Sequence, residues 1–287
     1  MIEFDPAPQF QEFANPERLV SAPWLSARLG VQGLRVIEVD EDALLYDIGH
    51  LPTATRINFQ SELLSPLTRD VISAEEFAEL MRSKGIKRDD TVVIYGDKNN
   101  WWAAFALWVF CLYGHPDVRL LDGGRDAWMS EERDTSYMVP EFPVSDYPVP
   151  ELNETPLRVF VDELRDGSLT LVDTRPADEF AGKPTETSIK GDSQYGTTIR
   201  HGHIPGAINL TWNVSVYPNG VFRNVEQLRE TYSQLDAKKS IALYSHLGAQ
   251  AAHTWFVLKF LLGFEDARVY DGSWAEWGNM VRMPIEL

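Results

Sequence analysis

Short runs of apolar residues alternate along this chain with longer segments in which apolar residues recur at helical spacing. The short runs predict buried strands at residues 34–39, 55–59, 91–95, 118–121 and 241–244. The helical spacing predicts helices over 73–84, 101–113 and 249–262, with another helix starting near residue 21. Because strands alternate with helices, we expect an α/β fold built on mainly parallel sheets that are flanked by helices.

Local signals mark where several of these helices begin and end. Ser21 is a candidate N-cap with Pro23 in the first turn, and Ser73 with Glu76 forms a capping-box pattern. Gly85 and Gly263 follow the last periodic residues of two helices, where C-caps are expected. These capping signals define the ends of the predicted helices more closely than hydrophobic periodicity alone.

The second half of the chain repeats the first. Tyr95 and Tyr244, Asp122-Gly123 and Asp271-Gly272, and Trp128 and Trp277 are each separated by 149 positions, so one register covers a strand, loop, helix, strand and turn. Upstream, His50-Leu51-Pro52 matches His203-Ile204-Pro205, and Asp40 has its counterpart near Asp173 or Arg175. The repeat predicts two copies of one domain.

We place the N-terminal copy at 17–135, a proline-containing extended linker at 136–156 and the C-terminal copy at 157–287. The second copy carries a longer loop between Phe180 and His201.

Residues 241–263 form the segment with the clearest chemical potential. A buried strand at 241–244 leads through the polar break Ser245–Gly248 directly into a helix. Such a turn directs several backbone N–H groups, together with the positive end of the helix dipole, at one point. It can therefore hold an anion or lower the pKa of a nucleophile, and Ser245 occupies the critical position.

Composition narrows the classes of partner. The net charge is −17, with 26 basic against 43 acidic residues, which argues against a surface that binds nucleic acid or an anionic membrane. Cys111 is the single cysteine, so an internal disulfide and a multi-cysteine metal site are both excluded. We expect a cytoplasmic protein that needs no metal or organic cofactor and acts on a small molecule, with anions among the candidates; the oligomeric state is left open.

Several motifs together resemble the tandem rhodanese family, the thiosulfate and 3-mercaptopyruvate sulfurtransferases. They are Asp173-Thr174-Arg175 at a strand end, Gly202-His203-Ile204-Pro205-Gly206-Ala207, the run 253–258 and Tyr270-Asp271-Gly272-Ser273-Trp274. The resemblance implies two rhodanese-like domains, with a non-catalytic first copy and an active loop at 245–250 in the second. It also implies a catalytic cysteine at the start of that loop, whose thiolate takes sulfur from a donor as a persulfide and passes it to an acceptor. Asp173 and Arg175 would brace the loop.

The sequence departs from the family at the decisive position, because Ser245 stands where the cysteine belongs. A hydroxyl cannot form a persulfide and is a poor nucleophile without an adjacent base. An engineered replacement would explain the serine alone, but the rest of the loop (His246, Leu247, Gly248, Ala249 and Gln250) also lacks the basic residues of many relatives. We therefore favour natural divergence.

The remaining candidates carry weaker signals. His246 could supply a proton or a positive charge, since the pKa of histidine lies near neutrality, or it could be an exposed loop residue. Lys183, Arg200 and His201 are possible pocket residues in the long loop. We expect His253, His50, His203 and the Asp122/Asp271 pair to be structural, and Cys111 to be buried.

Three hypotheses remain open at this point. The chain is a sulfurtransferase homologue with serine in the catalytic position, or a diverged enzyme in which Ser245 and His246 perform acid–base or hydrolytic chemistry. The third is a non-catalytic module that binds an anion or a partner.

Overall fold

The computed structural model describes residues 2–183 and 198–287, which form two compact units. The first comprises Met1–Asn153 and Val216–Asn224, and the second Glu154–Ser215 and Val225–Leu287. Residues 136–153 therefore pack with the first unit, as does a short segment from the second half of the chain. Two sheet-containing units confirm the α/β fold with duplicated domains.

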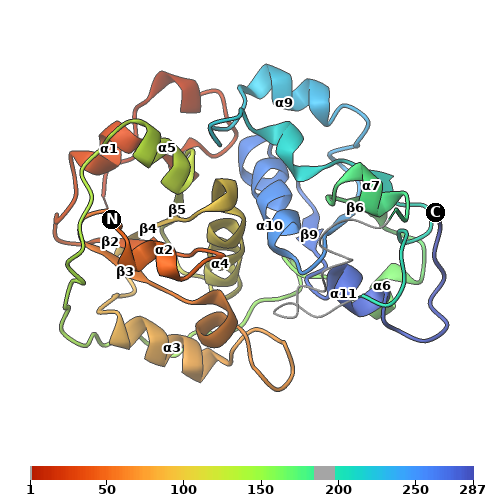
Figure 1. The fold of residues 1–287 in the computed structure, drawn as a ribbon, viewed down its shortest axis with the longest axis horizontal. Helices are drawn as coiled ribbons and strands as arrows, with labels where there is room; N and C mark the ends of the chain where they lie inside the picture. Colours follow the sequence, from red (N-terminus) through yellow and green to blue (C-terminus); the bar gives the residue numbers. More distant parts are fainter. Residues whose placement is uncertain (1, 184–197) are drawn as a thin grey trace. The chain divides into compact units, whose positions relative to one another are not determined.

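The first unit is built on a five-stranded parallel sheet in the order β1-β5-β4-β2-β3 (Figure 1). Its strands are β1 (Leu19–Val20), β2 (Leu34–Glu38), β3 (Ala54–Arg56), β4 (Thr91–Tyr95) and β5 (Val118–Leu121). Its helices are α1 (Ala22–Ser26), α2 (Leu44–Asp47), α3 (Ala74–Ser83), α4 (Trp101–Leu112) and α5 (Gly124–Ser130). Every residue of β4 is buried, because helices cover both faces of the sheet.

The second unit repeats this plan with a four-stranded parallel sheet in the order β7-β6-β8-β9. Its strands are β6 (Thr170–Asp173), β7 (Ile208–Asn209), β8 (Ile241–Tyr244) and β9 (Ala267–Val269). Its helices are α6 (Val161–Leu164), α7 (Ala177–Phe180), α9 (Val225–Thr231), α10 (Ala249–Phe256) and α11 (Ser273–Trp277). Helix α10 packs against β8 and β9 (Figure 1), so the residues that end β8 and begin α10 share one edge of the sheet.

The capping signals are confirmed. The Ser21 hydroxyl accepts the Trp24 N–H at the start of α1. Ser73 and Glu76 form a complete capping box on α3. Gly263 has φ +75°, the left-handed conformation expected after a helix.

One predicted strand was too long. The apolar run at 55–59 forms a strand only to Arg56, and Phe59–Leu63 is a π-helical turn. The side chain of Asn58 accepts the N–H groups of Gln60 and Ser61, and so caps this turn. An asparagine cap ended the strand where periodicity alone favoured its continuation.

No helix among the described residues combines the length and apolar character needed to cross a membrane.

Candidate functional site

The loop between β8 and α10 presents Ser245 at the end of a fully buried strand. Ser245 is 1% exposed, and its Oγ accepts the Gly248 N–H at 2.9 Å. Gly248 has φ +95°, and a Cβ on it would lie 3.2 Å from Asp271 Cα. A side chain here would be strained in conformation and crowded, so glycine closes the loop tightly around the serine hydroxyl.

The start of α11 fixes the loop backbone from the other side. The Ser245 N–H donates to Ser273 Oγ at 3.1 Å, and the Ser273 hydroxyl donates to the Tyr270 carbonyl. The Ser245 carbonyl accepts the Trp274 N–H at 3.0 Å, and the His246 carbonyl accepts the Ala275 N–H at 3.1 Å. The backbone N–H and the backbone carbonyl of Ser245 are therefore both held by residues at the start of α11.

Three N–H groups of the loop remain available. Those of Leu247, Ala249 and Gln250 donate no hydrogen bond to any residue within the described ranges. They sit at the N-terminal end of α10, where the helix dipole adds partial positive charge. Together with the Ser245 hydroxyl they form a donor set suited to an anion.

Asp173 and Arg175 form a buried ion pair behind this loop. Arg175 Nη2 lies 2.6 Å from Asp173 Oδ2 and also donates to the Gly202 carbonyl. The guanidinium carbon of Arg175 lies 4.5 Å from the ring centroid of Trp274, the residue whose N–H holds the Ser245 carbonyl. This chain of contacts supports the bracing role predicted for the pair.

The three possible pocket residues differ in their surroundings. Arg200 donates to the carbonyls of Gly278, Met283, Trp277 and Met280, so its guanidinium braces the end of α11. Lys183 is exposed and pairs with Asp178 at 2.8 Å. His201 is exposed. None of these contacts joins the three residues to Ser245, and part of the long loop, 184–197, lies outside the described residues.

His50 and His203 occupy equivalent places, as the repeat predicted. The imidazole of His50 stacks on Tyr46 with centroids 3.8 Å apart, and that of His203 stacks on Phe180 at 3.6 Å. Each Nδ1 is hydrogen-bonded to the carbonyl of its stacking partner. These contacts confirm a structural role for both histidines.

His253 lies in α10, is fully buried and meets Trp212 edge-to-face at 5.5 Å. Burial lowers its pKa to about 3, so it is neutral at physiological pH. In the unfolded chain histidine titrates near 6.5, so the unfolded state binds more protons below that pH. The free energy of unfolding should therefore fall as the pH drops from 6.5 towards 3, by about 2 kcal/mol at pH 5.

Urea unfolding of the native protein and a His253→Leu variant at pH 7.5 and pH 5 measures this contribution. We expect the native protein to lose about 2 kcal/mol more than the variant between the two pH values. An equal loss in both proteins would show that His253 is not held neutral by the fold.

The equivalent loop of the first unit cannot present a side chain in the same way. Gly96 takes the place of Ser245, and a Cβ on Gly96 would lie 2.1 Å from the Val39 carbonyl oxygen. Lys98, Asn99 and Asn100 then follow with φ of +48°, +55° and +69°. The backbone at Gly96 lies so close to the sheet that no side chain fits at the position equivalent to Ser245. This supports the prediction that the first copy is non-catalytic.

Sequence reasoning missed Ser273, which is fully buried, has φ +54° and holds the Ser245 N–H. The signal was present in the repeat, because Ser273 aligns with Gly124, which has φ +56°. A serine in a conformation that the other copy gives to glycine is costly and indicates a specific task.

Comparisons with known proteins agree with this architecture. The rhodanese-like domain family matches residues 21–131 and 158–280. The chain is 59% identical to thiosulfate sulfurtransferase of Corynebacterium glutamicum, over 99% of this chain and 95% of that protein. It is 50% identical to the putative thiosulfate sulfurtransferase SseA of Mycobacterium leprae, over 98% and 95% of the two chains.

The solved structure of wild-type EanB superimposes with a TM-score of 0.81 at 24% identity, covering 96% of this chain and 70% of EanB, and shows the shared fold. With both halves of the chain matched by the family, and with relatives matched over nearly their full length, the chain belongs to the rhodanese family and is a tandem-domain member of its sulfurtransferases.

Proposed function

We propose that the loop 245–250 binds a small sulfur oxyanion such as thiosulfate without forming a covalent persulfide. The donor set at the start of α10 supports the anion, and the relatives named thiosulfate sulfurtransferase support the chemical class. The single observation that carries the proposal is the hydrogen bonding of Ser245.

The Ser245 Oγ accepts the Gly248 N–H, which leaves the hydroxyl proton to donate to a ligand. Among the residues that the structure describes, no imidazole or carboxylate is hydrogen-bonded to this oxygen. A serine without a base remains a weak nucleophile, whereas a hydroxyl fixed in place is an effective donor to a bound anion.

The hydrolytic alternative needs the His246 imidazole to act as a base on Ser245. The His246 backbone is held by Ala275, and its side chain is half-buried. This alternative predicts turnover that both Ser245→Ala and His246→Ala abolish, whereas anion binding predicts no turnover. The cytoplasmic location and the assignment of Lys183, Arg200 and His201 to a pocket stay predictions.

Calorimetric titration of the native protein with sodium thiosulfate tests the proposal. We expect saturable binding that weakens about tenfold or more in Ser245→Ala, because a hydrogen bond to a charged group contributes about 1.5–3 kcal/mol. Ser240→Ala is a matched control, since Ser240 precedes β8 at the opposite end of the strand, and it should bind as the native protein does. Absence of binding, or equal affinity in Ser245→Ala, would refute the proposal.

A further inference from the structure

Asp122 and Asp271 occupy equivalent positions in the repeat but have different partners. Asp271 forms a bidentate ion pair with Arg158, whose Nε and Nη2 each lie 2.8 Å from one of the two carboxylate oxygens. The backbone of Arg158 forms a parallel β-bridge with Val269. In the first unit the residue equivalent to Val269 is Leu120, which pairs in the sheet with Leu19. The first unit therefore has a leucine where the second has the arginine.

The carboxylate of Asp122 is consequently buried without a cation. It is 9% exposed, and its Oδ1 accepts the Phe222 N–H at 2.9 Å. Within residues 2–183 and 198–287 no lysine, arginine or histidine forms an ion pair with it. Burial raises its pKa to about 7, which reflects the cost of keeping a negative charge at this place.

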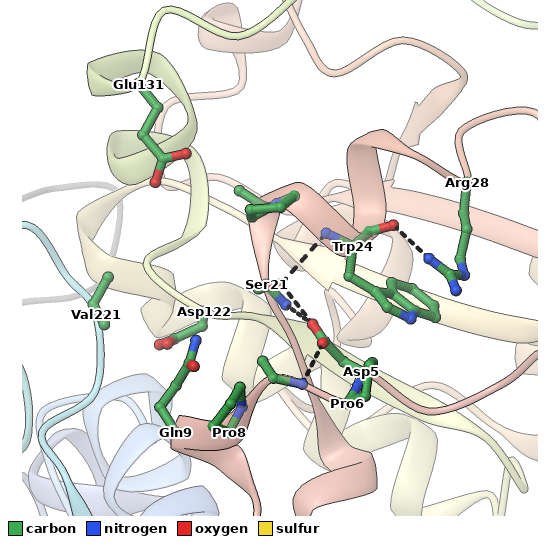
Figure 2. A pocket seen from close by; sticks show the side chains of 13 residues that line it. Asp5, Pro6, Pro8, Gln9, Ser21, Trp24, Arg28, Asp122, Glu131 and Val221 are labelled. Carbon is green, nitrogen blue, oxygen red and sulfur yellow. Dashed lines mark hydrogen bonds between the residues drawn. The ribbon is translucent and has the colours of Figure 1, made fainter.

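Asp122 lines a pocket of about 640 Å³ in the first unit (Figure 2). Pro8, Pro23, Trp24 and Val221 give the pocket largely apolar walls. Its size lies within the range of small-molecule sites, and apolar walls with a few polar groups are typical of them.

The other two carboxylates of the pocket already have partners. Asp5 accepts the Ala7 N–H and both the N–H and the hydroxyl of Ser21. Glu131 pairs with Arg133 at 2.6 Å. In Figure 2 the guanidinium of Arg28 lies on the far side of Trp24 from Asp122. Among the described residues neither Asp5 nor Asp122 forms an ion pair with a lysine, arginine or histidine, but Asp5 already accepts three hydrogen bonds. Asp122 is therefore the carboxylate of the pocket that is left to bind a cation.

We propose that this pocket binds a small organic cation, an ammonium or guanidinium group on a compact apolar body. The positive charge of the ligand would pair with Asp122, as the guanidinium of Arg158 pairs with Asp271. The apolar body would pack against the proline and valine side chains of the walls. This site lies wholly in the first unit and uses none of the residues of the loop 245–250, so it is independent of thiosulfate binding.

Saturation-transfer NMR titration of the full-length protein with benzylammonium tests this site, with neutral benzyl alcohol as the matched ligand. We expect saturable binding of benzylammonium. Benzyl alcohol should bind more weakly by about tenfold or more, since a buried charge pair contributes at least a tenfold gain in affinity. Asp122→Asn should weaken benzylammonium by about the same factor. Asp126→Asn, which removes an exposed carboxylate from α5, should leave its affinity unchanged.

A second variant tests the same site even if Asp122→Asn fails to fold. Val221→Lys places a cation on a half-buried wall of the pocket, where it can pair with Asp122 and exclude the ligand. We expect it to lose benzylammonium binding. The proposal is overturned if the native protein shows no saturable binding, if benzyl alcohol binds equally well, or if Val221→Lys or a folded Asp122→Asn binds as the native protein does.

Discussion

Replacing Ser245 with cysteine is expected to create thiosulfate:cyanide sulfurtransferase activity about a hundredfold or more above the native protein, equivalent to about 2.7 kcal/mol of transition-state stabilisation. The Gly248 N–H, which is 2.9 Å from Ser245 Oγ, would point at the new sulfur, and the start of α10 would favour its thiolate. The thiolate attacks the outer sulfur of thiosulfate, the sulfur–sulfur bond breaks and sulfite leaves. Cyanide then removes the bound sulfur as thiocyanate and regenerates the thiolate.

Thiocyanate formation measures this gain. Gly96→Cys would not be a fair control, because a Cβ at Gly96 collides with the Val39 carbonyl. Ser240→Cys is the matched variant, since it adds a thiol at the far end of the same strand, and we expect no activity from it. An inactive Ser245→Cys that still binds thiosulfate would show that the loop has lost more than its nucleophile.

Replacing Arg175 with leucine should lower the free energy of unfolding by about 3–5 kcal/mol, because it leaves the buried Asp173 carboxylate without its counter-charge. Asp173 is fully buried and Arg175 is 2% exposed, so solvent cannot replace the lost contacts. The variant also loses the donor to the Gly202 carbonyl and the cation packed on Trp274. We therefore expect weaker thiosulfate binding as well.

Urea unfolding followed by tryptophan fluorescence measures the loss. Lys183→Ala is the control: it breaks an ion pair whose side chains are 67% and 65% exposed, and should cause no measurable change. Similar stabilities for the two variants would mean that the buried pair does not brace the second domain.

Helix starts and buried strands were predictable from the sequence because their signals are local. The capping box of α3 and the apolar run of β8 each lie within a few residues. The boundary at Asn58 was not predicted, since an apolar run cannot show that an asparagine side chain will cap the next turn.

The repeat predicted the position of the loop but not the contacts that hold it. In the first unit the buried carboxylate at the strand end is Glu38, and its arginine partner is Arg125 from α5. In the second unit the carboxylate is Asp173, the last residue of β6, its partner Arg175 lies two residues further along the chain, and Trp274 stands at the position of Arg125. Both units therefore contain the buried ion pair, but the arginine comes from a different part of the chain in each. Aligning the two halves by residue type does not reveal this difference.

We propose that the loop retains its anion site but has lost covalent sulfur transfer. The most direct test is the intact mass of the native protein after incubation with thiosulfate and removal of free ligand, beside Ser245→Cys treated in the same way. Cys111 should not interfere, because burial raises the pKa of its thiol to about 11. We predict an unchanged mass for the native protein and the gain of one sulfur atom at residue 245 in the variant; a sulfur adduct on native Ser245 would contradict the account.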